Sequence, residues 1–544
     1  MNDDGQNIAQ PPVLRRWRTV YIAGIIVVSL PYAISFTSQL CSDDFILLYY
    51  YGVRPLWRIG VFFLPRTLWT YHPLQDFYVA LGWHISGIEP WGYRALSLAI
   101  HFGTALLLME FGRGLTGSIH VGGCAAIVFA GFWWQWEAIS WAASAATTES
   151  TFFCILTCVA FLSFLQRRRR AAYVGMIFAV VGWFFSKETI IQLPLFLTAI
   201  YVYQRWSVLE CGGPIGPIRP ISPIEPPHSK ILPDLARLLA VPVAIVVVYL
   251  IFYALFVHNT YTFAKLGYET APVNKWPANA ITWLDYSCNP LLGNEIVNTL
   301  GGRRIMRIIH QIAHWHLVAA ATLLLIAYFT VIRRRMLPLF ALGMMTIAMI
   351  PYLALRTPYF GNRYYYGVML GGSLLVVSLA REMWRTTAGK RGGWHSSIRI
   401  VVAATGGLWI VAHFVQLAQT TLHDRHANRT ARELYDFLAS QTDKADRSVL
   451  FIVDTTPVKD EVDVELGWGL LECARVALRS DTVAAVELGF DLERSLLKDF
   501  NGCREKYLVL RKETGWAITR LPDNSRLTIA PNGHGGVVLE KGTP

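Results

Sequence analysis

Apolar segments about as long as a membrane-spanning helix recur along the first 420 residues of the chain. A helix rises about 1.5 Å per residue, so about 20 apolar residues cross the hydrocarbon core of a bilayer. We therefore predict an all-α polytopic membrane protein with about 11 transmembrane helices. The predicted spans are residues 17–36, 91–111, 119–138, 148–166, 171–186, 189–205, 235–257, 313–332, 336–355, 364–381 and 399–418.

The basic residues predict the orientation of these spans. Three arginines precede or enter the first span and no small-residue cleavage site follows it, so we interpret it as an uncleaved span. With the N-terminus in the cytoplasm, the basic runs 167–170 and 333–335 also face the cytoplasm, as the positive-inside rule requires. We expect a multi-pass protein of the inner (plasma) membrane. The segments expected outside are residues 37–90, 258–312 and 421–544.

Residues 421–544 have a different pattern, with more charge and no long apolar run. Helical periodicity covers 429–441, and residues 448–453 and 506–511 have the composition of buried strands. Short runs at 516–520 and 537–540 are expected to form a hairpin. We therefore divide the chain into a transmembrane domain, residues 1–420, and a small extramembrane α/β domain, residues 421–544.

Composition supports a membrane protein and argues against binding to nucleic acid. The chain is 53% hydrophobic and 16% charged, whereas soluble domains carry about 25% charged residues. The net charge of +12 comes from lysines and arginines that flank apolar runs, as membrane topology demands. The eight cysteines lack metal-binding spacing. Cys41 with Cys288, or Cys473 with Cys503, could pair in an oxidising compartment.

Two adjacent carboxylates, Asp43 and Asp44, follow the outer end of the first span. A carboxylate at a membrane boundary is a candidate general base or metal ligand for chemistry on a lipid-borne substrate. The alternative is that the pair is solvated or caps the next helix. Adjacent side chains point in different directions, so only one of the two need face a substrate. Arg58, in the same outer segment, adds positive charge nearby.

Lys187 and Glu188 lie between two apolar runs with almost no loop. Charges in that position are costly unless they are used or paired. One interpretation is a mutual or interhelical ion pair. The other is that Lys187 holds a phosphate while Glu188 orients the phosphate or a neighbouring group.

Other candidates lie at the same outer boundary. Arg356 and Arg363 bracket a short loop before three tyrosines, which suits an anionic lipid head group or, alternatively, an aromatic belt with snorkelling arginines. Glu137 lies at the outer end of the third span, and His72 lies in the first outer segment. His101, inside an apolar run, is expected to be structural.

The ordered set of motifs resembles the GT-C fold glycosyltransferases that use polyprenyl-phosphate sugars. It is most similar to the protein O-mannosyltransferase superfamily, including the transmembrane O-mannosyltransferase-like proteins, here without a tetratricopeptide tail. The matching segments are Asp43-Asp44, residues 71–74 (Tyr-His-Pro-Leu), 87–94 (Gly-Ile-Glu-Pro-Trp-Gly-Tyr-Arg), His101, 137–141 (Glu-Ala-Ile-Ser-Trp), 186–188 (Ser-Lys-Glu) and 362–364 (Asn-Arg-Tyr).

The resemblance implies roles for individual residues. Asp43, or its neighbour Asp44, would be the general base for an acceptor hydroxyl, and Arg58, Lys187 and Arg363 would bind the donor phosphate. The resemblance also implies inversion at the sugar carbon and a lipid donor that enters from the membrane. Some members of the fold need a divalent metal such as Mg²⁺ or Mn²⁺ and others do not, and the acidic pair leaves this open.

The leading hypothesis is an integral-membrane glycosyltransferase. It would transfer a single sugar from a polyprenyl-phosphate donor to an extracytoplasmic acceptor, which is a glycan, a lipid or a protein. The first alternative is a polymerase or ligase that uses polyprenyl-diphosphate oligosaccharides. The second is a non-catalytic carrier or flippase for a lipid-linked sugar, although the paired repeats and broken helices of transporters are not evident here.

Overall fold

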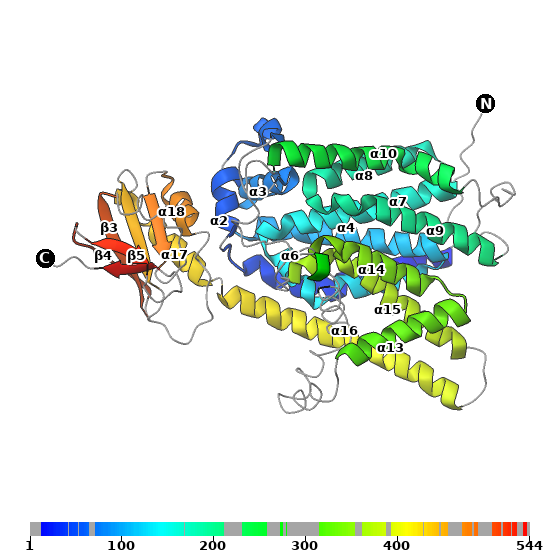
Figure 1. Cartoon of the computed structure of the whole chain (residues 1–544). Coiled ribbons are helices and arrows are strands. Elements are labelled where there is room, and N and C mark those ends of the chain that lie inside the picture. The colour runs from blue at the N-terminus through cyan, green and yellow to red at the C-terminus, as the bar shows by residue number, and fades with distance from the viewer. Residues whose placement is uncertain are drawn as a thin grey trace.

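The structure is a computed structural model in which a long helical bundle carries a small α/β unit at one end (Figure 1). The residues that it describes are 12–41, 43–52, 54–64, 71–167, 169–211, 231–257, 273–275, 279, 315–353, 362–387, 393–427, 429–444, 448–454, 470–480, 483–487, 503–512, 515–523, 525–529 and 537–540.

A helix coincides with each of the predicted spans. These helices are α1 (Pro12–Ser29), α4 (Trp91–Thr116), α5 (Ile119–Ala130), α7 (Ala145–Arg167), α8 (Arg170–Ser186), α9 (Leu193–Cys211), α10 (Ile231–Phe252), α13 (Trp315–Ala327), α14 (Leu337–Leu353), α15 (Tyr365–Thr387) and α16 (Gly393–Ala427). Among the described residues, six helices are long and apolar enough to cross a membrane by themselves, and four shorter helices are apolar. The prediction of an all-α polytopic protein is therefore confirmed.

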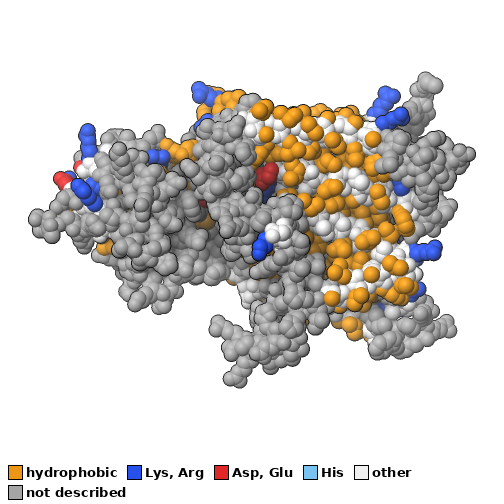
Figure 2. Space-filling view, in the orientation of Figure 1, with side chains coloured by type: hydrophobic (Ala, Val, Ile, Leu, Met, Phe, Trp, Pro, Cys, Tyr) orange, Lys and Arg blue, Asp and Glu red, His pale blue; other side chains and the backbone are white. Residues whose placement is uncertain are grey.

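The surface of the bundle supports the same conclusion. Figure 2 shows hydrophobic side chains spread over the bundle, with lysine and arginine side chains at its right-hand edge, the end at which the N-terminus lies. Exposed apolar side chains such as Phe178 (72% exposed) and Leu324 (71% exposed) would cost free energy in water but not in lipid. We conclude that the chain is a multi-pass membrane protein.

The third span was predicted to reach residue 138, and this boundary is wrong. Helix α5 ends at Ala130, and Gly131 caps it with its N–H donated to the carbonyl of Ile127. The chain continues through three short helices, η4 (Trp133–Gln135), α6 (Trp136–Ser140) and η5 (Ala142–Ser144), before α7 begins. The tryptophans after residue 130 are apolar, so in the sequence they look like a continuation of the span. In the structure they lie in the short helices that follow α5.

The segment between α1 and α4 consists of short helices and the longer helix α3 in its described part. Helix α1 continues into η1 (Leu30–Thr37), which is followed by α2 (Asp43–Leu47), η2 (Leu48–Gly52), η3 (Leu56–Phe63) and α3 (Pro73–Ser86). On η3, Trp57 is 69% exposed, which suits a helix that lies at the membrane surface. Helix α2 presents both carboxylates of the acidic pair in its first turn.

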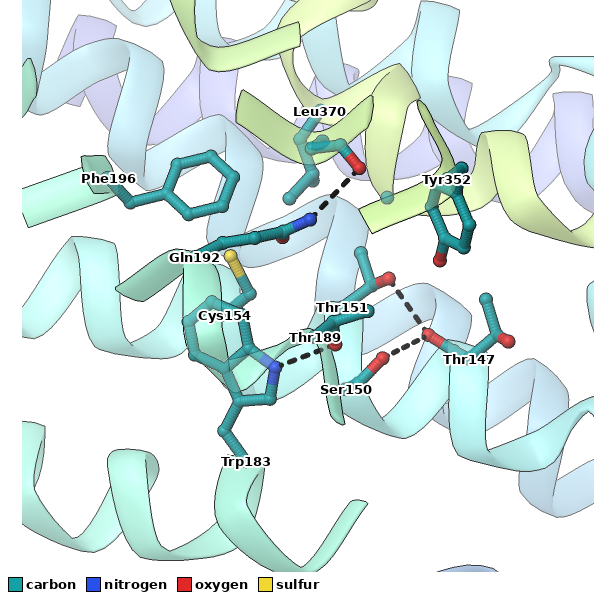
Figure 3. A pocket seen from close by; sticks show the side chains of 12 residues that line it. Thr147, Ser150, Thr151, Cys154, Trp183, Thr189, Gln192, Phe196, Tyr352 and Leu370 are labelled. Carbon is teal, nitrogen blue, oxygen red and sulfur yellow. Dashed lines mark hydrogen bonds between the residues drawn. The ribbon is translucent and has the colours of Figure 1, made fainter. Parts of the chain in front are cut away.

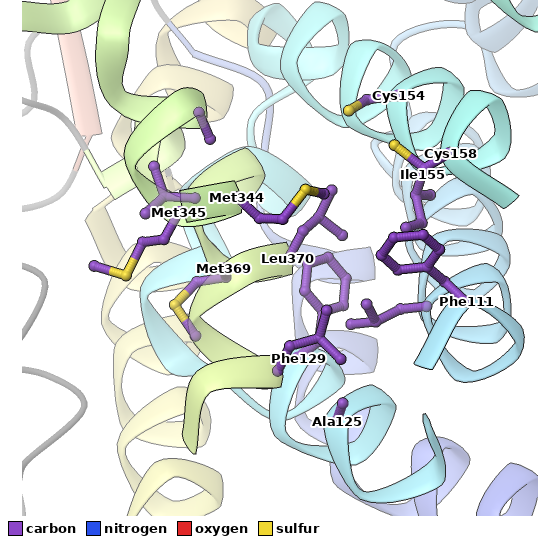
Figure 4. Close-up of a cluster of buried hydrophobic side chains, with 14 of the residues drawn as sticks. Phe111, Ala125, Phe129, Cys154, Ile155, Cys158, Met344, Met345, Met369 and Leu370 are labelled. Carbon is purple, nitrogen blue, oxygen red and sulfur yellow. The ribbon is translucent and has the colours of Figure 1, made fainter. Parts of the chain in front are cut away.

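The core of the bundle is an apolar cluster that joins α4, α5, α7, α14 and α15. Figure 4 shows part of it, where Phe111 and Phe129 pack near Ile155, Met344 and Leu370. Helices α4 and α5 approach so closely that a Cβ atom added at Gly122 would lie 2.0 Å from the carbonyl oxygen of Met109. Small residues allow this approach, as is common where membrane helices pack together.

The C-terminal unit contains a four-stranded sheet in the order β2-β1-β3-β4. Its strands are β1 (Val449–Asp454), β2 (Val483–Glu487), β3 (Glu505–Lys512) and β4 (Gly515–Arg520). Strands β2 and β3 run parallel to β1, and β4 is antiparallel to β3. Helices α17 (Arg429–Ala439) and α18 (Leu470–Leu478) supply side chains to the same core as the sheet. The predicted α/β unit is confirmed.

The predicted hairpin between 516–520 and 537–540 is wrong. Strand β4 pairs with β3, and β6 (Val537–Glu540) pairs with β5 (Arg526–Ile529) in a separate two-stranded sheet. Short strands of similar composition can pair with several partners, so the pattern indicated that strands exist but not which ones pair. Helix α18 and strands β2 and β5 were not predicted.

Candidate active site

Asp44 is buried, and each of its carboxylate oxygens accepts a hydrogen bond. One of its carboxylate oxygens accepts the Ala143 N–H at 2.8 Å and the other accepts the Cys41 N–H at 3.3 Å. The guanidinium of Arg94, itself fully buried, lies 4.0 Å away. Burial raises the pKa of Asp44 to about 6, although Arg94 and the two N–H donors favour the charged form. Asp44 therefore fixes α2 to the segment before α7.

Asp43 occupies the neighbouring position on α2 and is half-buried. Consecutive residues on a helix project in different directions, so Asp43 does not share the enclosed environment of Asp44. A general base must reach the proton of its substrate, and a partly exposed carboxylate can do so more readily than an enclosed one.

Ala143 connects the acidic pair to a second group of polar residues. Its carbonyl oxygen accepts a hydrogen bond from the side-chain amide of Gln75 on α3, while its N–H is donated to Asp44. His72 immediately precedes α3, which begins with Pro73 at its first position, a preferred place for proline. The His72 ring contacts Gln75 Oε1 at 3.2 Å through Nδ1 and Glu188 Oε2 at 2.9 Å through Nε2.

Glu188 therefore pairs with His72 rather than mainly with Lys187. Burial would raise the pKa of Glu188, but the hydrogen bond with His72 and the nearby charge of Lys187 outweigh it and lower the pKa to about 2. The contact spans 116 residues of sequence and ties the start of α3 to η6 (Glu188–Gln192). The orienting role of Glu188 stays a prediction, and His72 is the side chain that it contacts.

Lys187 lies at the junction of α8 and η6, where the backbone is extended, and its side chain is buried. Its ammonium donates to the hydroxyl of Thr147 at 2.8 Å and lies 5.2 Å from the centre of the Tyr364 ring. Burial lowers the pKa of Lys187 to about 8, Glu188 opposes the shift and Arg363 adds to it. Among the described residues, this cation has one neutral hydrogen-bond partner, so two of its three N–H donors remain available.

Arg363 lies in η12 (Asn362–Tyr364) and binds Glu137 on α6. Its guanidinium donates to Glu137 Oε1 at 2.9 Å, and its backbone N–H donates to Glu137 Oε2 at 3.1 Å. The same guanidinium lies 4.5 Å from the ring centre of Trp141 and 5.0 Å from that of Tyr364. Lys187 and Arg363 thus both lie close to the ring of Tyr364.

One of the predicted phosphate ligands, Arg58, is not brought next to Lys187 and Arg363. Arg58 is exposed on η3, where its guanidinium lies 5.1 Å from the ring of its neighbour Trp57, and no contact among the described residues joins it to Lys187 or Arg363. Arg356 lies outside the described residues. His101 is buried, with one ring nitrogen 2.9 Å from the Tyr366 hydroxyl and the other 3.2 Å from the Ala130 carbonyl, which agrees with the structural role expected for it.

Sequence reasoning missed several residues of the site. Thr147 and Gln75 carry no unusual signal in the sequence, because their roles depend on contacts with distant residues. Glu149 could have been found, since a carboxylate within an apolar run is a functional candidate by default. It is buried on α7, and its Oε2 has no hydrogen-bond partner among the described residues.

A small pocket opens beside Thr147 within the bundle (Figure 3). Its volume is about 20 Å³, which is enough for about one water molecule and too small for a sugar. The hydroxyls of Ser150 and Thr151 donate to the carbonyl of Thr147, so they face the pocket mainly as acceptors. The pocket is lined by Thr147, Ser150, Thr151, Cys154, Trp183, Thr189, Gln192, Phe196, Ala348, Tyr352, Gly367 and Leu370.

Metal-binding groups do not cluster in the described part of the chain. There, no set of three or more His, Cys, Asp or Glu side chains is placed to hold a metal ion. The acidic pair supplies only two carboxylates, and no third His, Cys, Asp or Glu side chain among the described residues completes a metal site with them. We therefore derive no step through a metal.

No family model and no curated protein matches the chain. Among solved structures, the chain is similar to ArnT from Cupriavidus metallidurans bound to undecaprenyl phosphate, with a TM-score of 0.45 and 11% identity over 92% of this chain and 93% of that chain. It is also similar to an oligosaccharyltransferase from Archaeoglobus fulgidus tethered with an acceptor peptide, with a TM-score of 0.45 and 14% identity over 85% of this chain and 63% of that chain. These similarities are distant, and the proposed function rests on the side-chain geometry.

Proposed function

We propose that the protein is an integral-membrane glycosyltransferase that transfers one sugar from a polyprenyl-phosphate donor to an extracytoplasmic acceptor. The observation that carries the proposal is Lys187, a buried ammonium with a neutral hydroxyl as its one described hydrogen-bond partner. A buried cation is costly unless anions balance it, and the nearby carboxylate of Glu188 is hydrogen-bonded to His72 instead of to the ammonium. A lipid phosphate at the outer boundary of the membrane would supply an anion in direct contact with Lys187.

The second cation supports the same ligand. Arg363 is held by Glu137 through both its backbone and its side chain, so its guanidinium is fixed in place beside Tyr364. Planar guanidinium groups bind phosphate oxygens well, while the lysine ammonium acts as a point charge. Together, Lys187 and Arg363 would bind the phosphate of the donor and stabilise the negative charge that grows on it as it leaves.

Asp43 is the general base in this proposal. Its carboxylate takes the proton from the acceptor hydroxyl, and the acceptor oxygen then forms a bond to the anomeric carbon of the sugar. The bond between that carbon and the phosphate oxygen breaks, and polyprenyl phosphate leaves with the electron pair. Attack opposite to the leaving group inverts the configuration at the sugar carbon. Asp44 acts by positioning α2 through Ala143 and Cys41.

The test is sugar transfer by purified protein in nanodiscs, with polyprenyl-phosphate mannose, glucose and arabinose as donors and an extract of envelope glycans, lipids and proteins as acceptors. We expect Asp43→Asn to reduce transfer at least 100-fold while the binding of polyprenyl phosphate persists. Lys187→Met should weaken that binding. Transfer that persists in Asp43→Asn would exclude this mechanism, and a parallel reaction with EDTA tests whether Mg²⁺ or Mn²⁺ is needed.

A further inference from the structure

Three arginines surround one buried carboxylate near the end of α15. Glu382 is 5% exposed. Its Oε1 lies 3.3 Å from Nη1 of Arg385, and its Oε2 lies 3.7 Å from Nε of Arg335, which stands just before α14. Arg381 is close enough to interact electrostatically with Glu382 and with both arginines. Among the described residues, no other carboxylate lies within 4.0 Å of any of these arginines.

This group lies at the opposite end of the bundle from the candidate active site. Helix α15 begins at Tyr365, two residues after Arg363, and ends at Thr387. At about 1.5 Å per residue, its 23 residues span about 35 Å, which is enough to cross the hydrocarbon core of a bilayer. The predicted orientation makes the end of α15 the cytoplasmic end, at which Figure 2 shows lysine and arginine side chains.

The backbone before α14 has an unusual conformation that brings Arg335 to this place. After η11 (Tyr328–Ile332), Arg334 is in the left-handed region with a φ of 52°. Glycine or asparagine usually occupies such a position, because a Cβ atom strains it. The N–H of Arg335 is donated to the carbonyl of Phe329 at 2.8 Å, which closes the turn. The turn places the side chain of Arg335 beside Glu382.

The protein balances only part of the positive charge of this group. Three guanidinium groups carry three positive charges and Glu382 carries one negative charge, which leaves an excess of two. Arg381 is half-buried, so water screens its repulsion from Arg335 and Arg385 only in part. The positive-inside rule accounts for basic residues at this end, but not for their meeting at one carboxylate from two elements. An added anion would stabilise the group.

The group is accessible from the lipid. The side chains of Arg335 and Arg385 are 52% and 48% exposed. Close to them in the chain, Ile332 is 67% exposed and Trp384 is 44% exposed. Exposed apolar side chains of a membrane protein face acyl chains, and tryptophan is typical of the level of the head groups. A lipid could therefore place its acyl chains along this surface and its phosphate at the arginines.

We propose that Arg335, Arg381 and Arg385 bind the phosphate of an anionic phospholipid in the leaflet opposite the candidate active site. Guanidinium groups suit phosphate oxygens, and basic pockets between membrane helices on the cytoplasmic side bind anionic head groups. A zwitterionic phospholipid carries its own cation, which the excess positive charge disfavours. Glu382 holds Arg335 and Arg385 in place. The proposal goes beyond sugar transfer and does not depend on it.

The experiment measures the binding of phosphatidylglycerol and of phosphatidylcholine to the full chain in detergent by native mass spectrometry. Arg381→Gln and Arg385→Gln each remove one charge and leave Glu382 paired with Arg335. Arg170→Gln is the matched control. Arg170 is an exposed arginine at the start of α8, whose other end carries Lys187, and it forms no ion pair with a described residue.

We expect the unaltered protein to bind phosphatidylglycerol at least tenfold more tightly than phosphatidylcholine. Arg381→Gln and Arg385→Gln should each weaken the binding of phosphatidylglycerol about tenfold, because a hydrogen bond to a charged group is lost, and the control should not. Equal affinity for the two lipids, or an equal loss in the control, would overturn the proposal. Displacement of phosphatidylglycerol by inorganic phosphate at the same concentration would instead indicate a site for a free anion, and would also overturn it.

Thermal stability separates a lipid site from a purely structural role. Arg381→Gln removes repulsion from two arginines, so its Tm in phosphatidylcholine nanodiscs should equal or exceed that of the unaltered protein. The rise in Tm that phosphatidylglycerol nanodiscs give should shrink in this variant. A Tm that falls equally in both lipids would show that Arg381 stabilises the fold without a lipid, which contradicts the proposal.

Discussion

At the scale of single residues, the charged side chains of the candidate site differ in how many partners the protein itself gives them. Asp44 has two N–H donors and a nearby arginine, and Arg363 has a carboxylate. Among the described residues, the one hydrogen-bond partner of the Lys187 ammonium is the neutral hydroxyl of Thr147. The sequence placed all of these residues at one boundary, but burial and contacts separate those that hold the structure from those that are available to a ligand.

The pH dependence of donor binding tests Lys187. Burial disfavours its charged form and lowers its pKa to about 8, so the ammonium is lost as the pH rises through that value. If only the charged form binds phosphate, affinity for undecaprenyl phosphate should be roughly eightfold lower at pH 9 than at pH 7.5. Lys187→Arg should remove this dependence, because arginine stays protonated over the whole range. A flat profile in the unaltered protein would contradict the assignment.

The substitution Asp44→Asn tests its structural role. It leaves the buried guanidinium of Arg94 without its carboxylate and removes one acceptor for the backbone N–H groups. Breaking a buried pair by removing one partner costs on the order of 3 kcal/mol. We expect a clearly lower Tm in detergent, whereas Asp43→Asn should leave Tm unchanged. Equal Tm values for the two variants would show that the residues do not differ in this way.

At the scale of elements, the helices follow the apolar pattern closely, but their ends and their packing do not. The tryptophan-rich residues 133–141 look like the end of a span, yet Gly131 ends α5 and short helices follow. Strand β6 was expected to pair with β4 and instead pairs with β5. Local composition indicates which state a segment prefers, whereas its ends and partners depend on what packs against it.

The substitution Gly122→Ala tests the packing of α4 against α5. The new Cβ atom would lie 2.0 Å from the carbonyl oxygen of Met109, so the two helices would have to separate. Overpacking of this kind typically costs about 1–3 kcal/mol. We expect less folded protein by size-exclusion chromatography and a lower Tm. Gly406→Ala is the control, because a Cβ atom there would have no neighbour within 4 Å.

At the scale of the whole molecule, the C-terminal unit packs directly on the helix that carries the acidic pair. Tyr435 of α17 stacks on Phe45 of α2 with ring centres 6.0 Å apart, and Arg432 pairs with Glu89 at 2.9 Å. The guanidinium of Arg475 lies 5.2 Å from the ring centre of Tyr49. These contacts hold α2 between the bundle and the C-terminal unit, so we expect this unit to help position Asp43.

The substitution Tyr435→Ala tests that role. Losing the stack on Phe45 should loosen α2 and reduce sugar transfer about threefold to tenfold, because aromatic pairs contribute about 0.5–1.5 kcal/mol. Binding of undecaprenyl phosphate should not change, since Lys187 lies on other elements. Arg429→Ala is the control on the same helix, because the partner of Arg429 among the described residues is Glu433 of α17 itself. Equal transfer rates in the two variants would show that the contact of Tyr435 with Phe45 does not contribute to catalysis.

The sequence by itself determined which segments are apolar enough to lie in the membrane and which charged residues flank them. Both follow from local properties, because the cost of placing a side chain in lipid depends mainly on that side chain and its near neighbours. Only the tertiary structure decided which of those residues meet. Glu188 contacts His72 across 116 positions, and Arg363 contacts Glu137 across 226. Such pairs form only when distant helices pack together, and the pattern of residues within one segment does not indicate which helices will pack.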